Sequence, residues 1–113
     1  MYSSELIKGT LKVIILKLLA DGNRMYGYEL SQKVTELTAG KIELKEGALY
    51  PILHKLEADG LVTVVEESFG KRIRKYYSLT GSGKNETNQR VEEILDFIKT
   101  IESIMKPRTA LGI

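Results

Sequence analysis

Residues 47–61, which read GALYPILHKLEADGL, predict a short helix whose two faces differ in character. The inner face is formed by large apolar side chains that fall within about 60° of one another at helical spacing: Leu49, Ile52, Leu53 and Leu56. The outer face is small at its N-terminal end and mildly basic further along: Gly47, Ala48, Pro51, His54, Lys55 and Ala58. A slim helix end of this kind fits the major groove of B-DNA. Groove insertion is therefore the hypothesis, and an ordinary surface helix is the alternative.

The amino-acid composition limits the classes of protein to which this chain can belong. The chain has 113 residues, of which 42% are hydrophobic and 28% are charged, and this predicts one small globular domain. It has no cysteine, which excludes disulfide frameworks, thiolate zinc sites and cysteine nucleophiles and fits a reducing compartment. We see neither a basic-then-apolar leader nor an apolar run of membrane-spanning length, so we expect a soluble, cytoplasmic protein without a membrane partner.

Charge is distributed unevenly along the chain, although the formal net charge is only +2. Residues 71–75, KRIRK, hold four cations and no acid. Residues 85–102 hold five acids against two bases. The positive patch therefore lies in the middle of the chain, and its position is a better argument for a nucleic-acid partner than the total charge is.

Two helices are predicted before the opening stretch. Residues 4–20 carry an apolar stripe that further apolar residues widen to most of the circumference: Leu11, Ile14, Ile15 and Leu18, with Val13, Leu16 and Leu19. In so small a domain, a partner chain is expected to cover part of such a helix, and Gly22 is its expected left-handed cap. Residues 26–38 predict the second helix, with three apolar side chains facing inward: Leu30, Val34 and Leu37.

A short strand at residues 42–44 is expected to precede the opening helix, which runs from about 46 to 59 and ends at Gly60. Pro51 predicts a late helix start or a slight bend, because its ring clashes with the preceding turn. Residues 61–65 and 71–79 then predict the two strands of a hairpin, with residues 66–70 as the turn region and a basic tip.

Residues 84–105 predict a long last helix, for which Thr80 is a plausible N-cap. Its apolar residues are spaced alternately three and four apart: Val91, Ile94, Ile98, Ile101 and Met105. Leu95, Phe97 and Ile104 extend this seam on its flanks. The seam could pack onto its own domain, but the helix overruns a three-helix core, so a homodimer seam is the preferred interpretation.

The order helix, helix, short strand, helix, strand, basic turn, strand, long helix is typical of a winged helix-turn-helix. The fold class is therefore mainly α with a small β-hairpin (α+β), followed by a long C-terminal helix. The predicted organisation is a DNA-binding domain over residues 1–80, a dimerisation helix over 81–106 and a flexible tail over 107–113.

Three motifs in this order resemble the PadR family of transcriptional regulators. They are YGYEL at residues 26–30, the opening stretch at 47–61, and RKYYSLTGSG at 74–83. The resemblance covers about residues 6 to 105 and is closest to the short subfamily, which has one C-terminal dimerisation helix. Residues 45–48, KEGA, depart from the family's usual Ser-Pro-Gly-Thr entry to the third helix.

The resemblance implies a homodimeric winged-helix repressor. Its first and last helices would form the dimer interface, its third helix would enter the major groove, and its wing would reach the adjacent backbone. Some short members bind flat aromatic drugs in a pore between subunits, and others answer phenolic acids. Ile94 stands where drug-binding relatives carry an aromatic residue, with Phe97 one turn further on.

The expected DNA contacts combine the outer face of the third helix, the basic wing and two residues near the second helix. They are Tyr26, Lys33, Lys45, Gly47, Ala48, Tyr50, Pro51, His54, Lys55, Lys71, Arg72 and Arg74. For the cations the alternative is a solvated hairpin, and for Tyr26 it is packing. Lys75 and Arg74 are expected on opposite faces of their strand, so only some of the wing cations reach DNA.

The expected dimer interface is apolar and comes from the first and last helices: Leu11, Ile14, Ile15, Leu18, Val91, Ile94, Leu95, Ile98, Ile101 and Met105. An effector pocket for a small hydrophobic or aromatic molecule is expected between these helices, near Ile14, Leu18, Ile94 and Phe97. Two-fold symmetry predicts a pseudo-palindromic double-stranded DNA operator with half-sites about 34 Å apart.

Catalysis and metal binding are not expected. His54 is the only histidine, and without cysteine it can build neither a catalytic triad nor a usual metal site. No cofactor is predicted. The main hypothesis is therefore a DNA-binding repressor that is relieved by a small molecule or set by its abundance. The alternatives are a winged-helix module that binds protein and a DNA-binding protein that has no ligand. The four clustered cations of the wing favour DNA, because an interaction module does not need them.

Overall fold

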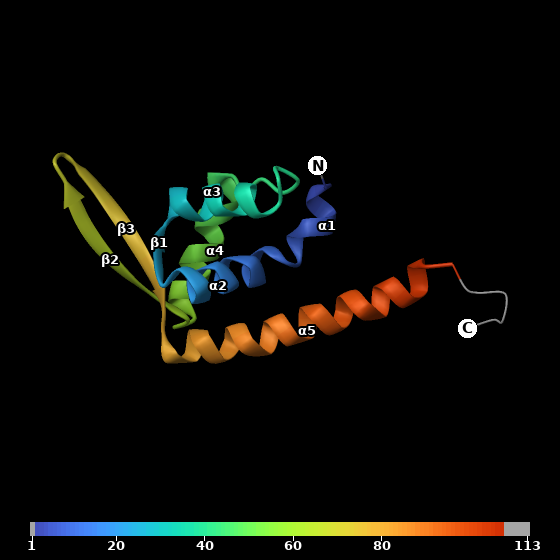
Figure 1. Cartoon of the computed structure of the whole chain (residues 1–113). Helices are drawn as coiled ribbons and strands as arrows, with labels where there is room; N and C mark the ends of the chain where they lie inside the picture. The colour runs from blue at the N-terminus through green and yellow to red at the C-terminus, as the bar shows by residue number, and fades with distance from the viewer. Residues whose placement is uncertain (1, 108–113) are drawn as a thin grey trace.

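The computed structural model describes residues 2–107 and, within them, five helices and three strands (Figure 1). In chain order these are α1 Ser4–Lys8, α2 Leu11–Gly22, β1 Arg24–Tyr26, α3 Gly27–Leu37, α4 Glu46–Ala58, β2 Val62–Phe69, β3 Arg72–Leu79 and α5 Gly81–Met105. This is the predicted fold class, a mainly α chain with a small antiparallel sheet and a long C-terminal helix. The predicted tail lies outside the described residues, except for Pro107.

The core is built on the inner face of α4, as the spacing of its leucines predicts. Leu49, Leu53 and Leu56 have no exposed surface, and Ile52 is half-buried against them. They share one apolar cluster with residues of α2, α3 and the sheet: Ile15, Leu16, Leu19, Leu30, Val34, Val62 and Tyr77. Burying each large side chain contributes about 1.5–3 kcal/mol, so this cluster is the main source of stability.

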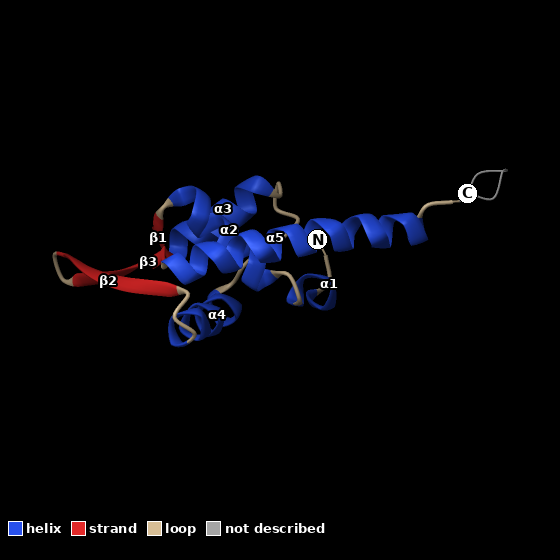
Figure 2. Cartoon of the chain, turned by 90° about the horizontal axis from the view of Figure 1, so that it is seen from below, coloured by secondary structure: helices blue, strands red, loops and turns tan. Residues whose placement is uncertain are grey.

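β3 is the central strand of the sheet, with β1 and β2 antiparallel on either side. Successive side chains alternate between a face toward the core, which includes Tyr77, and an outward face, which includes Arg74. Because β1 pairs only with residues 76–78, the rest of the hairpin projects as a two-stranded ribbon. We call residues 66–75 the wing. The wing and α5 leave the helical body in opposite directions (Figures 1 and 2).

α5 begins against the turn that ends α4. The hydroxyl of Thr80 accepts a hydrogen bond from the N–H of Gly83 at 3.0 Å and donates one to the carbonyl of Gly60 at 2.7 Å. The N–H of Thr80 donates to the carbonyl of Leu61 at 3.0 Å. A Cβ at Gly83 would overlap that Leu61 carbonyl oxygen. Thr80 is thus confirmed as the N-cap, and we call these four residues the α4–α5 junction.

The first half of α5 packs along α2, and its second half projects beyond the body (Figure 1). Glu86 pairs with Lys12 of α2 at 3.7 Å and with Arg90 at 2.9 Å. Hydrogen bonding to Arg90, and then the charges of Arg90 and Lys12, lower the pKa of the Glu86 carboxyl. Ile98 and Met105 are more than half exposed on the projecting part. Although α5 is long, no helix in the described part of the chain is apolar enough to cross a membrane.

The predicted helix at residues 4–20 is wrong in its continuity, because α1 ends at Lys8 and α2 begins at Leu11. The backbone N–H and the hydroxyl of Thr10 both donate to the carbonyl of Ile7, at 2.9 and 2.8 Å, and close α1 with a separate turn. The expected cap at Gly22 is also wrong. The helix includes Gly22, and the positive φ of 73° belongs to Asn23.

Residues 42–44 form no strand; the third strand is instead β1, which the sequence did not reveal. The carbonyl of Leu44 accepts a hydrogen bond from the Ser31 hydroxyl at 2.8 Å, so this segment is held by α3 rather than by a sheet. Leu37 was expected to face inward but is 66% exposed. It lies on the same side of α3 as Leu30 and Val34, but it is the last residue of the helix and lines two surface hollows beyond the core.

Other boundaries differ by a few residues. The expected turn at residues 66–70 is mostly strand, since β2 continues to Phe69 and pairs there with Arg72. The late start that Pro51 predicted does not occur, because α4 begins at Glu46. The last helix begins at Gly81, three residues earlier than expected.

Replacing Gly83 by Ala should lower the free energy of unfolding by about 1–3 kcal/mol, because the new methyl group meets a backbone carbonyl that has little room to move. The measurement is urea unfolding followed by circular dichroism at one fixed protein concentration. Gly81→Ala is the matched control, since a Cβ there has nothing within 4 Å. The control should leave stability unchanged or raise it by up to about 1 kcal/mol. Equal effects of the two substitutions would contradict the junction.

Candidate nucleic-acid interface

The outer face of α4 gathers five of the predicted site residues on one exposed surface: Gly47, Ala48, Pro51, His54 and Lys55. A Cβ at Gly47 would have nothing within 4 Å, so this end of the helix is bare as well as slim. Lys45 is the exposed N-cap residue and makes no side-chain capping bond. Glu46 lies in the first turn, where a negative charge suits the positive end of the helix dipole.

Tyr50 is half-buried and holds α4 against α3. Its hydroxyl lies over Gly27, where a Cβ would be only 2.5 Å away. The absence of a side chain at Gly27 therefore allows the close crossing of the two helices. Tyr50 was expected to contact phosphate through its hydroxyl; the structure shows that its ring also sets the position of α4.

A notch of about 320 Å³ separates α4 from β3. Its lining residues come from β1, α3, α4 and β3: Tyr26, Gly27, Tyr50, His54, Ile73, Arg74, Lys75 and Tyr77. Three donor side chains on α4 and on the same face of β3 as the buried Tyr77 line it, Tyr50, His54 and Lys75, and none of the lining residues is a carboxylate. The notch is therefore suited to an anion with several oxygen acceptors.

Arg74 is the residue that joins the wing to the body. Its guanidinium lies 4.5 Å from the ring centre of Tyr26 and 4.6 Å from that of Phe69. Tyr26 in turn meets Tyr76 edge-to-face at 5.4 Å. The neighbouring Tyr76 hydroxyl, more than any other group, raises the pKa of Arg74. Tyr26 thus packs beneath Arg74, as the packing alternative for this residue expects, and it is also one of the residues that line the notch.

The wing is less basic along its length than at its tip. Glu67 lies opposite Arg74 and also pairs with Arg24 at 2.7 Å. Glu66 lies opposite Lys75. At the tip, Arg72 faces Phe69 instead of an acid, and Lys71 occupies the turn. The uncompensated positive charge of the wing is therefore at its end, and the prediction that Lys75 and Arg74 face opposite ways is confirmed by the register.

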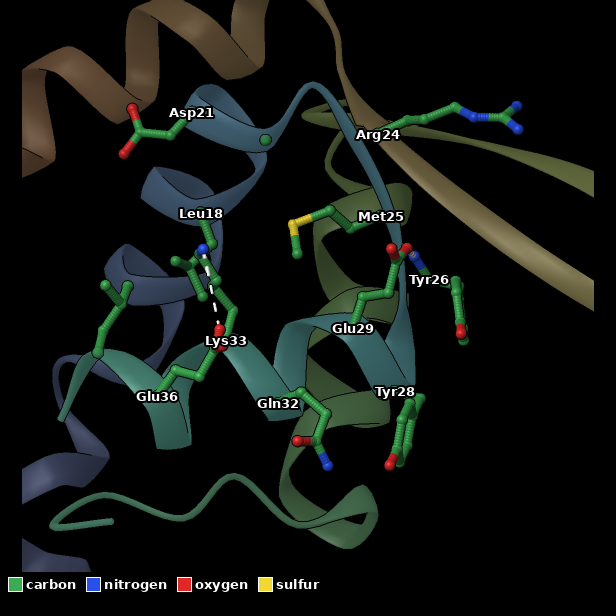
Figure 3. A pocket seen from close by; sticks show the side chains of 12 residues that line it. Leu18, Asp21, Arg24, Met25, Tyr26, Tyr28, Glu29, Gln32, Lys33 and Glu36 are labelled. Carbon is green, nitrogen blue, oxygen red and sulfur yellow. Dashed lines mark hydrogen bonds and ion pairs between the residues drawn. The ribbon is translucent and has the colours of Figure 1, made fainter. Parts of the chain in front are cut away.

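Lys33 lies apart from the predicted DNA contacts of α4 and the wing, although Tyr26 lines the same pocket. It lines a separate pocket of about 610 Å³ between α2, β1 and α3, and its Nζ lies 3.9 Å from Glu36 (Figure 3).

Three of the expected dimer residues are part of the protomer's own core. Leu11, Ile15 and Leu18 are 8%, 0% and 6% exposed, so they have almost no surface left for a partner. The remaining candidates are Ile14 and the apolar residues of α5. Ile14, Leu18 and Ile94 do line an apolar groove of about 240 Å³ between α2 and α5, but Phe97 does not.

The prediction missed several residues of the outward sheet face: Arg24, Phe69 and Tyr76. Period-two alternation was the available signal, because it places Arg72, Arg74 and Tyr76 on one face of a strand. Because residues 66–70 were expected to form a turn and no strand was expected at residues 24–26, Phe69 and Arg24 could not be placed on this face.

This chain is similar in sequence and in structure to known transcriptional regulators. Residues 15–89 match the model of the transcriptional regulator PadR-like family. A transcriptional regulator of Mycobacterium tuberculosis is 33% identical over 93 residues, which cover 80% of this chain and 83% of that protein.

Two solved structures are similar over nearly the whole chain. A transcriptional regulator from Clostridium thermocellum has a TM-score of 0.83 and 31% identity, covering 90% of this chain and 99% of the other. A PadR family transcriptional regulator from Eggerthella lenta has a TM-score of 0.79 and 25% identity, covering 92% and 88%.

Arg74→Ala should loosen the wing without unfolding the body. Losing two exposed cation–π contacts, each worth about 0.5–1 kcal/mol, should speed amide hydrogen exchange in residues 66–73 by about fivefold while residues 76–79 stay protected. Lys75→Ala, on the opposite strand face, is the control and should change exchange less. Equal acceleration by both substitutions would show that the ring contacts do not hold the wing.

Proposed function

Because the chain belongs to the PadR-like family of transcriptional regulators, we propose that it is a repressor that binds a pseudo-palindromic DNA operator as a homodimer. Its family is one of regulators and not of enzymes. The observation that carries the proposal is the notch between α4 and β3, where side-chain donors converge without a carboxylate. With α4 in the major groove, a backbone phosphate beside the groove is the anion that such a notch accepts.

The outer face of α4 is a second argument for insertion of this helix into the major groove. Gly47 and Ala48 leave the helix end without bulk, so the backbone can approach base edges closely. His54 and Lys55 then lie one to two turns further along the same face and supply the donors. Lys55 is held 3.1 Å from Asp59 and can exchange this exposed pair for a phosphate at little cost.

The wing tip supplies a second contact. Lys71 and Arg72 lie at the end of the ribbon, opposite no acid, and extend the positive surface away from α4. The acids of β2 balance the cations nearer the body. The proposed role of the tip is therefore contact with phosphate or the minor groove beyond the site that α4 reads.

α5 supports the proposed dimer. Its projecting half carries exposed apolar side chains that the protomer leaves uncovered: Leu95, Phe97, Ile98, Ile104 and Met105. Pairing two copies along this seam would hide these residues and fix the distance between the two α4 helices. The groove at Ile14 and Ile94 would then lie next to the subunit boundary, where a small hydrophobic or aromatic effector could relieve repression.

Lys71→Ala combined with Arg72→Ala should weaken binding to every DNA sequence, because the lost contacts are to the backbone. The slope of log affinity against log salt should become shallower by about 0.9 for each lost phosphate contact, and affinity at 0.1 M salt should fall by about tenfold or more. Lys84→Ala with Lys106→Ala removes the same charge from α5 and its C-cap and is the control. An unchanged slope in the wing variant would refute the contact.

Selection of bound sequences from random DNA supplies the operator and reveals whether it is palindromic.

Ile98→Glu should convert the dimer to a monomer in sedimentation velocity experiments, because it places two like charges in an apolar seam. Ser103→Glu is the matched control, since Ser103 is exposed and lies about 140° around α5 from Ile98, so it should leave the dimer intact. Circular dichroism checks that both variants stay helical. A folded Ile98→Glu variant that still sediments as a dimer would contradict the seam.

A further inference from the structure

The pocket between α2, β1 and α3 is not used by the proposed DNA interface (Figure 3). Its volume of about 610 Å³ lies within the range of sites that bind small molecules. Leu18, Met25 and Leu37 give it an apolar floor. Leu18 and Leu37 also line the groove between α2 and α5, so the apolar surface continues from one hollow into the other. This floor suits a ligand with an apolar body.

The side chains around that floor make the pocket acidic. Asp21, Glu29 and Glu36 line it, and Lys33 is the ammonium group that enters it. Arg24 contributes to the lining, but its guanidinium is turned to the outward sheet face, where it lies 2.7 Å from Glu67 and above Tyr76 (Figure 3). Asp21 is paired with Lys17 at 3.0 Å, and Glu29 accepts a hydrogen bond from the N–H of Tyr26 at 3.1 Å. Glu36, whose contact with Lys33 is longer at 3.9 Å, is therefore the carboxylate most open to a ligand.

Two tyrosines form an aromatic wall. The rings of Tyr26 and Tyr28 are stacked, with centroids 6.5 Å apart and planes inclined by 20°. Tyr28 is 64% exposed, so one face of its ring is open to a ligand. An open ring face of this kind can pack against the apolar body of a ligand.

Lys33 would compete with the ammonium group of a ligand for the position beside Glu36. Its Nζ lies 3.9 Å from Glu36, at the outer limit of an ion pair, and both side chains are about half exposed or more. An exposed pair of this length contributes little to stability. An incoming ammonium group can therefore displace Lys33 from Glu36 at small cost.

We infer that this pocket binds an amphipathic organic cation. The ammonium group lies beside Glu36, in the place that Lys33 occupies, and the apolar body lies over Leu18 and Met25, toward the rings of Tyr26 and Tyr28 (Figure 3). This places a ligand site on the winged-helix body, apart from the groove at the subunit boundary.

The site is connected to the wing through one ring. Tyr26 lines the pocket, and Arg74 stacks on Tyr26 at 4.5 Å. A cation that moves or covers this ring changes the contact that orients the wing. Ligand binding and DNA binding are therefore coupled, a step that rests on the proposed function. Each changes the affinity of the protein for the other by the same factor.

The binding test uses 4-phenylbutylamine as the probe and 4-phenylbutanol as its uncharged match, without DNA. In two-dimensional NMR titrations of the protein, the amine should shift the amides of Tyr28, Gln32 and Glu36 and bind several-fold more tightly than the alcohol. Equal affinities, or shifts confined to the groove between α2 and α5, would overturn the site.

Two variants test the arrangement in opposite directions. Glu36→Gln should weaken amine binding by about threefold, whereas Lys33→Gln should tighten it, because it removes the internal competitor. Thermal unfolding checks that both variants remain folded. A Lys33→Gln variant that binds the amine no better than the unaltered protein would refute the displacement of Lys33.

The coupling test repeats DNA binding with and without the amine. The amine should change DNA affinity in the unaltered protein and lose this effect in Arg74→Ala, which should still bind the amine. Amine binding that leaves DNA affinity unchanged would refute the coupling while the site stands. Amine binding by a protein that binds no DNA would refute the proposed function and not the site.

Discussion

The close approach of α5 to the end of α4 is the constraint on which the rest of the structure depends. The carbonyl of Leu61 occupies the space in which a side chain at Gly83 would begin, and Thr80 binds the same turn through Gly60. Backbone contacts of this kind have little freedom, unlike pairs of long charged side chains. The helix proposed to read DNA and the helix proposed to form the dimer are therefore joined as one rigid unit, and the leucine core of α4 anchors that unit in the protomer.

In the wing, the residues that hold it to the body differ from those that carry its uncompensated positive charge. A two-stranded ribbon is marginal by itself in water, so its stem needs additional contacts. Arg74 supplies them by stacking between Tyr26 and Phe69, and the acids of β2 balance the cations of the stem. Only the tip retains positive charge without an acid opposite. The same arginine that was expected to contact DNA thus has a structural task, and the arrangement leaves Lys71 and Arg72 as the freer cations.

Much of this fold could be predicted from the sequence because the signals were local. Helical spacing of the leucines in α4 predicted its buried face, and Thr80 was recognised as a cap from its residue type alone. The errors have non-local causes. β1 has three residues and exists because β3 offers it an edge, which no pattern within those residues indicates. The apolar stripe of α2 predicted burial, but not whether the cover is the same protomer or a partner, and Ile15 is covered by its own chain. Arg74 was identified as a cation, whereas its ring neighbours come from two other strands.

The α4–α5 junction has a mechanical consequence. With 25 residues, α5 is about 37 Å long, so it acts as a lever whose fulcrum is the turn at Gly60 and Leu61. A tilt of about 5° at that fulcrum moves the far end of the helix by about 3 Å. In the reverse direction, a ligand that tilts α5 would pass part of that rotation to α4. The stiffness of the contact between Gly83 and the Leu61 carbonyl would then determine what fraction of that rotation reaches α4.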